Sequence, residues 1–294
     1  MVGTKVSVKI ISWLHIYSKN NDFHLIAITA SLCLLLFSNS HTIDVIIPCT
    51  SKDKRTLELC IEGIQKNGKN INRIIVISDK KLTDNAEWFD EKKYPFSRID
   101  IATYIFKDKQ KTKNYLTKRK NRIGWIFQQL LKLYALFVVP DISDDILVLD
   151  ADTIFLRPIT FIDEDGTALY GIGSEYHMPY FEHGKKLIPG FKRVIESVSG
   201  ICHHMLFQRS VLQDLFTVVE QHHKEKFWQA FCNCIDLKNL AGSCASEYEL
   251  YFNFIFDNQY PVKIRKLRWS NIRFSNFNKK KKEPYDYLSC HTYL

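Results

Sequence analysis

The chain has 294 residues, of which 46% are hydrophobic and 13% aromatic, so it can bury a substantial single core and is not disordered. Its formal net charge of +9 comes from 41 basic and 32 acidic residues, and part of it lies in residues 279–282, which are all lysine. This run indicates a solvated loop, with a phosphate-binding or membrane-surface patch as the alternative. Because no zinc finger, RNA-binding signature or aromatic-interleaved basic stripe accompanies it, we expect no nucleic-acid partner.

Eight cysteines are spread along the chain without a C-x-x-C pair, at positions 33, 49, 60, 202, 232, 234, 244 and 290. This spacing supports neither a zinc ribbon nor a small scaffold dense in disulfides. We expect reduced thiols, although one or two bridges would also fit the sequence.

The amino terminus carries Lys5, Lys9 and Lys19 ahead of an apolar stretch from Phe23 to Phe37, which small polar residues follow. The pattern is typical of a signal peptide or a short signal anchor, although a full span needs about twenty residues. We therefore predict a basic segment (1–22), a hydrophobic signal or anchor segment (23–41) in contact with a membrane, and an enzyme domain (42–294). A cleaved signal, or a structural helix on a cytoplasmic protein, are the alternatives.

From residue 42 the chain alternates between strand and helix patterns. Residues 43–48 and 73–77 are apolar strands, and residues 56–66 between them have helical spacing, which predicts a parallel β-α-β unit. Residues 84–98 are irregular, 99–106 are predicted as a strand, and 107–122 form a basic polar stretch. A helix is predicted over 125–135.

The run Ile146–Leu149 has the character of a buried central strand, and it ends at Asp150-Ala151-Asp152. In extended backbone Asp150 and Asp152 would lie on one face, within reach of one ion or one metal-bound polyphosphate. Carboxylate oxygens suit Mg²⁺ or Mn²⁺. Two solvated aspartates that cap a turn are the alternative explanation. The apolar strand before them favours a site for a nucleotide diphosphate.

The order of these segments resembles the GT-A-fold nucleotide-sugar glycosyltransferases. The likeness rests on a V-I-I-P strand, an I-V-I-S-D strand, a G-W-x-x-Q-Q-L-L-K-L helix and the segment L-V-L-D-A-D-T-x-F-L-R-P. It covers residues 42–294, is most specific over 124–158, and is closest to poorly characterised bacterial and viral members, with a looser likeness to glycogenin-like retaining enzymes. It implies a single α/β domain with a Rossmann-like mixed sheet flanked by helices.

The resemblance also implies roles for individual residues. Pro48 and Thr50 would lie against the nucleotide, and Asp79 would face its base. Lys132 would point at the donor, and Asp150 and Asp152 would hold the divalent cation. A C-terminal histidine completes the metal shell in the glycogenin-like enzymes, and His291 is the match here, although the longer motif around it is absent.

The acceptor side is expected in the second half of the chain, where polar residues interrupt apolar segments. Glu247 or Glu249 is a candidate general base if the enzyme inverts configuration, and His203 or His204 is a candidate for positioning the acceptor. Packing or surface roles are the alternatives for these histidines. Aromatic residues of a loop after the strand 168–172 would suit a sugar; they are Tyr176, His177 and Tyr180.

The sequence thus predicts a metal-dependent glycosyltransferase that moves a sugar from a nucleotide-diphosphate sugar to a hydroxyl of a carbohydrate, lipid or protein acceptor. Two alternatives belong to other classes. A haloacid-dehalogenase-like phosphatase also has a strand ending in D-x-D, but Ile154 stands where such enzymes need Thr or Val. A non-catalytic carbohydrate-binding or interaction protein on the same fold is the other alternative.

Overall fold

The computed structural model describes residues 42–118 and 120–291, within the compact unit Thr42–Leu294. The segments predicted over 1–22 and 23–41 lie outside the described residues. No helix in the described ranges is both long and apolar enough to cross a membrane. Every cysteine in these ranges is a free, buried thiol, as expected for them.

The described strands form a central sheet in the order β3-β2-β1-β4-β7 and two smaller sheets, β5-β10-β9 and β6-β8. The strands are β1 (Ile43–Pro48), β2 (Ile71–Ser78), β3 (Glu87–Asp90), β4 (Asp145–Leu149), β5 (Thr153–Phe155), β6 (Ala168–Tyr170), β7 (His204–Gln208), β8 (Val262–Ile264), β9 (Trp269–Arg273) and β10 (Tyr287–His291). In the central sheet β1, β2, β3 and β4 run parallel, and β7 is antiparallel to β4.

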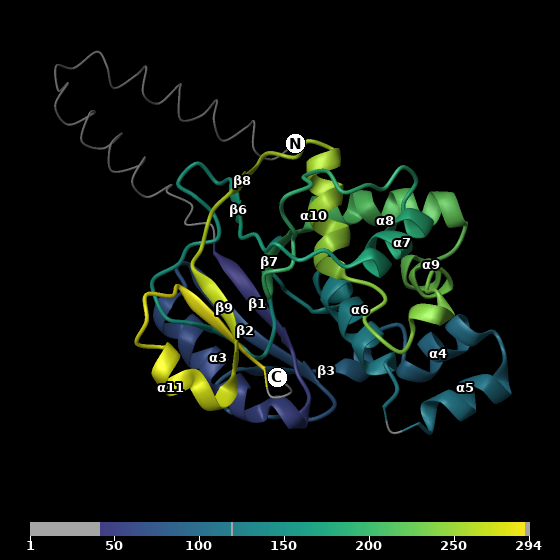
Figure 1. Ribbon diagram of the computed structural model, residues 1–294, viewed down its shortest axis with the longest axis horizontal. Coiled ribbons are helices and arrows are strands. Elements are labelled where there is room, and N and C mark those ends of the chain that lie inside the picture. Colours follow the sequence, from purple (N-terminus) through teal and green to yellow (C-terminus); the bar gives the residue numbers. More distant parts are fainter. Residues whose placement is uncertain (1–41, 119, 292–294) are drawn as a thin grey trace, which may run out of the picture. The chain divides into compact units, whose positions relative to one another are not determined.

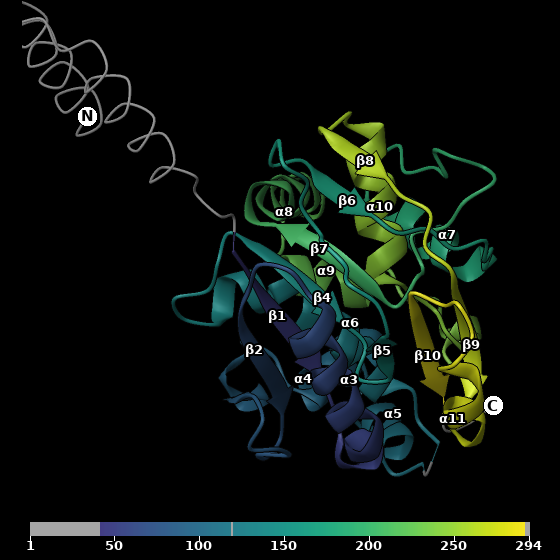
Figure 2. The same cartoon turned by 90° about the vertical axis from the view of Figure 1, so that its left-hand side faces the viewer.

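Helices lie on both faces of the central sheet (Figures 1 and 2). The longer ones are α3 (Lys54–Asn67), α4 (Arg98–Phe106), α5 (Lys109–Leu116), α6 (Ile123–Val138), α7 (Met178–Leu187), α8 (Arg209–His223), α9 (Phe227–Asn233) and α10 (Glu247–Asp257). Short helices are η1 (Ser51–Asp53), η2 (Glu91–Lys93), η3 (Leu237–Asn239), η4 (Phe274–Asn276) and α11 (Phe277–Lys280). Helix α3 covers one face, and α6 lies on the other, where it contacts α4 and α10 (Figure 2). The predicted mixed sheet flanked by helices is therefore confirmed.

The predicted parallel β-α-β unit is present as β1-α3-β2. Residues 99–106, in contrast, form helix α4, so the predicted strand is wrong. The Ser97 hydroxyl accepts a hydrogen bond from the backbone N–H of Asp100, and the Asp100 carboxylate accepts one from the backbone N–H of Ser97. This capping box satisfies backbone donors of the first helical turn and outweighs the strand preference of the β-branched residues that follow.

Candidate active site

The D-A-D segment lies at the edge of the sheet where the parallel strands β1, β2 and β4 all end. It is not extended backbone, because the Thr153 N–H donates to the carbonyl of Asp150 at 3.0 Å and closes a tight turn between β4 and β5. The expectation that strand geometry places both carboxylates on one face is therefore wrong. The turn instead gives Asp150 and Asp152 different sets of partners.

Asp150 is bound by the buried ammonium group of Lys132, which α6 supplies. Lys132 Nζ lies 2.5 Å from Asp150 Oδ1 and 2.6 Å from Glu247 Oε1 on α10. It also donates to the Tyr248 hydroxyl at 3.2 Å and stands 4.3 Å from the centroid of that ring. Lys132 and Glu247 are each only 2% exposed, so three elements meet around one enclosed cation. Lys132 thus contacts two protein carboxylates in this structure, and its direction toward a donor stays a prediction.

The pKa values follow from the balance of burial and charge. Burial alone would raise the pKa of Asp150, but Lys132 and His203 outweigh burial and hold it well below its usual range. Burial would lower the pKa of Lys132, and Asp150 with Glu247 raise it instead. For Glu247 burial dominates and raises its pKa, because Lys132 only partly offsets it. The surroundings as a whole therefore favour the charged form of Asp150 more than that of Glu247.

His203 occupies the other side of Asp150, with its Nδ1 at 3.3 Å from Asp150 Oδ2. Its backbone is left-handed (φ 65°), an uncommon conformation for a residue other than glycine. The ring packs edge-on against Trp269 and His291, with centroid distances of 5.3 Å in both cases. Its Nε2 is buried and has no hydrogen-bond partner among the described residues. Such an atom is normally satisfied by water or a ligand.

Asp152 is bound by His291, whose Nδ1 lies 2.9 Å from Asp152 Oδ2. The strand register explains this contact. Strand β10 runs antiparallel to β5 with Ser289 opposite Thr153, and the Cys290 N–H donates to the carbonyl of Asp152 at 2.8 Å. The next residue of β10 therefore reaches the D-A-D turn. His291 Nε2 lies 3.0 Å from Asn271 Oδ1 on β9.

The residues expected around the nucleotide lie at the same edge of the sheet. Pro48 is the buried last residue of β1, whereas Thr50 and Asp79 are exposed in the loops after β1 and β2. The Thr50 hydroxyl donates to Asp53 at 3.3 Å. Burial raises the pKa of Asp53, and the charge of Asp152 adds to this effect, so the loop after β1 lies beside the D-A-D turn.

Two predicted catalytic residues do not join this cluster. Glu249 accepts hydrogen bonds from the Ser199 hydroxyl and, at 2.9 Å, from the Asn253 amide, within the core. His204 is buried, with Nδ1 at 3.0 Å from the carbonyl of Cys202 and its ring among aromatic side chains. Burial lowers the pKa of His204 to about 3. Of the two adjacent histidines, His203 is the one at the site.

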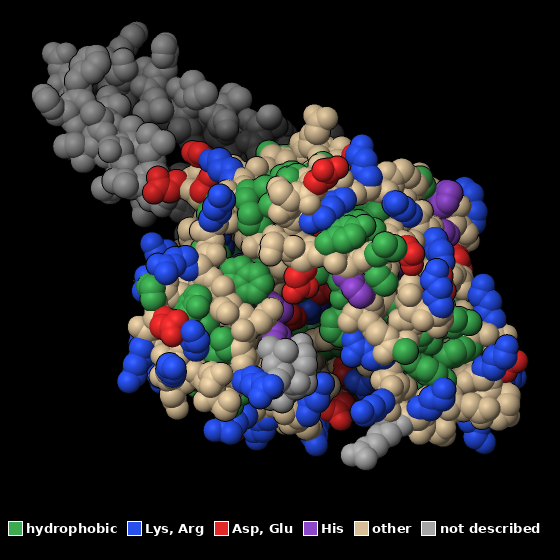
Figure 3. Space-filling view, viewed as in Figure 1, with side chains coloured by type: hydrophobic (Ala, Val, Ile, Leu, Met, Phe, Trp, Pro, Cys, Tyr) green, Lys and Arg blue, Asp and Glu red, His purple; other side chains and the backbone are tan. Residues whose placement is uncertain are grey.

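The carboxylate oxygens of the D-A-D turn are suitable ligands for a divalent cation. Asp150 and Asp152 supply the carboxylate oxygens that Mg²⁺ and Mn²⁺ prefer, and their side chains are 21% and 23% exposed. Asp152 Oδ1 has one distant contact, at 3.5 Å from the Ser289 hydroxyl. In residues 42–118 and 120–291, no three histidine, cysteine or acidic side chains are already arranged to hold an ion. Acidic and histidine side chains gather in a hollow near the centre of the face in Figure 3.

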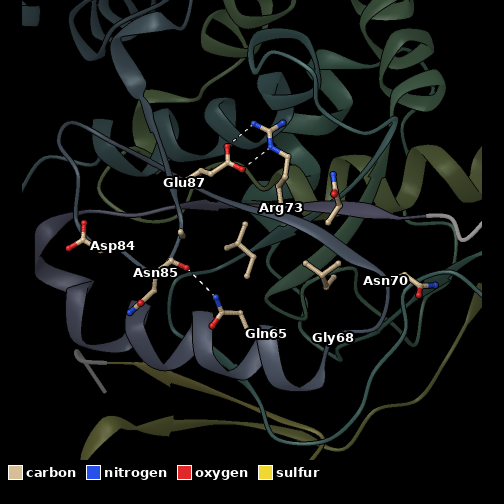
Figure 4. A pocket seen from close by; sticks show the side chains of 11 residues that line it. Gln65, Gly68, Asn70, Arg73, Asp84, Asn85 and Glu87 are labelled. Carbon is tan, nitrogen blue, oxygen red and sulfur yellow. Dashed lines mark hydrogen bonds and ion pairs between the residues drawn. The ribbon is translucent and has the colours of Figure 1, made fainter.

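A groove of about 620 Å³ between α3 and the beginning of β2 is a different feature (Figure 4). Its polar groups already pair with one another: Arg73 binds both carboxylate oxygens of Glu87 at 2.9 and 2.8 Å, and the Gln65 amide donates to the Asn85 carbonyl. It lies at the amino-terminal end of β2, whereas ligands of α/β sheets bind at the carboxyl ends. This groove is therefore not the candidate site.

The model of a family of unknown function, DUF6492, matches residues 40–267. The chain belongs to this family. No curated protein matches this DUF6492 member. Among solved structures it is similar to mouse xyloside xylosyltransferase 1 in its apo form. The TM-score is 0.43 at 11% sequence identity, and the match covers 86% of this chain and 98% of the mouse chain.

Proposed function

We propose that this protein is a metal-dependent glycosyltransferase that takes its sugar from a nucleotide-diphosphate sugar. The observation that carries the proposal is the D-A-D turn. It presents two partly exposed carboxylates where β1, β2 and β4 end. Ligands of α/β sheets bind at such an edge.

Asp152 is the stronger candidate ligand for the cation, with Asp150 and His291 beside it. Asp150 already contacts Lys132 and His203, whereas Asp152 Oδ1 has, among the residues that the structure describes, only a long hydroxyl contact. A bound Mn²⁺ or Mg²⁺ would offset the negative charge that develops on the departing diphosphate. Pro48, Thr50 and Asp79 are proposed to border the nucleotide.

Lys132 and Glu247 are positioning residues in this proposal. Glu247 is 2% exposed and bound to Lys132, so it holds the ammonium group against Asp150 and does not contact an acceptor. The ionised state of Asp150 is thereby fixed before any ligand binds, which is the preorganisation that electrostatic catalysis needs. The proposed acceptor is a hydroxyl group of a carbohydrate, lipid or protein, and membrane contact through residues 23–41 stays a prediction.

The test is calorimetric titration of UDP and GDP into the full chain, with Mn²⁺ and with excess EDTA. We expect binding that requires Mn²⁺ and weakens at least tenfold in Asp152→Asn. The matched control is Asp84→Asn, because Asp84 is exposed and pairs with Lys81 far along the chain from the D-A-D turn. Absence of nucleotide binding under every condition would rule out the transferase. Hydrolysis of p-nitrophenyl phosphate that is lost in Asp150→Asn would then favour the phosphatase.

A further inference from the structure

The loop between β6 and α7 begins beside the candidate site. At its start, Gly173 and Ser199 exchange two backbone hydrogen bonds of 2.8 and 3.0 Å. The Trp269 indole N–H donates to the carbonyl of Ile172 at 3.2 Å, and the same ring packs against His203. The first residues of the loop are therefore fixed beside the histidine that contacts Asp150.

The far end of the loop is fixed on the α10 side of the site. His177 Nε2 lies 2.8 Å from the carbonyl of Ser243, and the Arg122 guanidinium binds Gly242 and Ser243 at 3.0 Å each. This segment leads directly into α10, which begins at Glu247. The exposed residues of the loop between Gly173 and His177 therefore span the distance from His203 to the start of α10.

Glu175 is one of these exposed residues, and its charge reaches both sides of the site. Burial lowers the pKa of His203, but Asp150, Asp152 and Glu175 raise it. Burial raises the pKa of Tyr180 to about 12, and Glu175 adds to that shift. The influence of Glu175 on both His203 and Tyr180 agrees with a loop whose two ends are fixed by hydrogen bonds on either side of the site.

Tyr176, the next residue of the loop, presents an exposed aromatic ring. Its side chain is 57% exposed, although the ring stacks on Phe181 at 5.2 Å and Arg193 stands 4.9 Å from its centroid. Arg193 is also only 5.9 Å from the Phe181 centroid. These distances form a nearly equilateral triangle, so Phe181 and Arg193 lie on the same side of the tyrosine ring. Partners centred over opposite faces would be separated by nearly the sum of their distances to the ring.

The ring is also held rigidly. Phe181 is a buried residue of α7, and the Arg193 guanidinium donates two hydrogen bonds to the carbonyl of Val198 at 3.3 and 3.0 Å. An exposed aromatic ring whose supports are fixed loses little conformational entropy when a ligand stacks on it. A surface tyrosine without such support would be an unremarkable exposed residue.

We propose that Tyr176 and Glu175 form an acceptor subsite for a sugar ring, so that the acceptor is a carbohydrate. A sugar ring has C–H groups on its faces and hydroxyl donors around its rim. The free aromatic face is electron-rich and suits the C–H groups, and the carboxylate accepts hydrogen bonds from the hydroxyls. The inference rests on the proposed transferase function, and it selects carbohydrate over lipid and protein among the acceptors.

The test is saturation-transfer NMR on the full chain with methyl glycosides of glucose, galactose, mannose and xylose. We expect transfer to the ring protons of at least one glycoside, with at least tenfold weaker binding in Tyr176→Ala and retained binding in Tyr176→Trp. Glu175→Gln is expected to weaken binding severalfold. Ile99→Ala is the matched control, because Ile99 is 63% exposed on α4 and lies outside the site. Thermal denaturation verifies that each variant is folded.

Nucleotide titration of the same variants separates this inference from the transferase proposal. Tyr176→Ala should bind UDP or GDP with Mn²⁺ as native protein does. Two outcomes would overturn the acceptor subsite alone. The first is a protein that binds the nucleotide but gives no saturation-transfer signal with any glycoside. The second is glycoside binding that Tyr176→Ala leaves unchanged. If the protein binds no nucleotide but binds a glycoside through Tyr176, the sugar subsite is supported and the transferase proposal is contradicted.

Discussion

At the scale of single residues, Lys132 carries its charge inside the core because two carboxylates surround its ammonium group. We predict that Lys132→Met destabilises the protein by about 3–5 kcal/mol, since the buried carboxylate of Glu247 and the partly buried carboxylate of Asp150 would lose their cation. Urea denaturation at pH 7.5 measures this change. Lys132→Met/Glu247→Gln should recover part of the loss, because one buried negative charge is then removed.

Lys192→Met is the matched control, because Lys192 pairs with Asp257 at the surface and is 64% exposed. Its loss should change the free energy of unfolding by at most about 0.5 kcal/mol. An unfolding midpoint for Lys132→Met equal to that of this control would show that the buried carboxylates do not depend on Lys132.

Part of the site could be predicted from residue types alone. Asp150 and Asp152 follow an apolar strand, and the structure places both at the carboxyl edge of the sheet. The sequence made both Glu247 and Glu249 candidates for a general base. Residues two apart on a helix point to different faces, so the two cannot both contact one site. The place of His203 depends on its left-handed backbone and on packing against Trp269, neither of which local sequence specifies.

At the scale of elements, α3 approaches β5 so closely that one helix position must lack a side chain. A Cβ on Gly63 would lie 2.9 Å from the Phe155 carbonyl oxygen and 3.0 Å from its nitrogen. We predict that Gly63→Ala destabilises the protein by about 1–3 kcal/mol, because the helix must move away from the strand that follows the D-A-D turn. Urea denaturation measures the change, and Mn²⁺-dependent nucleotide binding should weaken with it.

Gly124 supplies the matched control for that prediction, since it lies in α6 and a Cβ there would meet nothing within 4 Å. Gly124→Ala should stabilise the protein by about 0.5–1 kcal/mol through helix propensity and reduced freedom of the unfolded chain. Equal effects of the two substitutions would contradict the close packing of α3 against β5.

Elements with strong local sequence signals were predicted correctly. Elements for which helix and strand signals compete, or which depend on pairing with a distant strand, were not. The helical spacing of residues 56–66 and 125–135 corresponds to α3 and α6. The strand prediction for 99–106 followed the β-branched residues of this segment. The capping box at Ser97 and Asp100 is a local sequence signal for the start of a helix, and it would have given the correct prediction. The pairing of β10 with β5, which brings His291 to Asp152, joins residues far apart in the chain and has no local signal.

At the scale of the whole molecule, the core encloses neutral imidazoles as well as apolar side chains. Burial lowers the pKa of His183 to about 4 and that of His204 to about 3. At these two positions the unfolded chain, whose histidines have pKa values near 6.5, binds more protons than the folded chain below that pH. The contribution of these two neutral histidines to the free energy of unfolding is therefore fully present above about pH 6.5 and is lost as the pH falls toward 4. Mild acid should accordingly destabilise the fold.

His183→Gln isolates this effect from the other titrating groups. His183 Nε2 lies 2.9 Å from the carbonyl of Phe231, so the glutamine amide can still donate there and the substitution removes the titration. The difference in unfolding free energy between native protein and variant should shift by about 2 kcal/mol in the variant's favour between pH 7.5 and pH 5. Urea denaturation at both pH values measures it, with His222→Gln, a substitution at an exposed position of α8, as the control. A constant difference for His183→Gln would mean that the folded protein accepts a proton at this position, and the acid sensitivity of the core would then have another source.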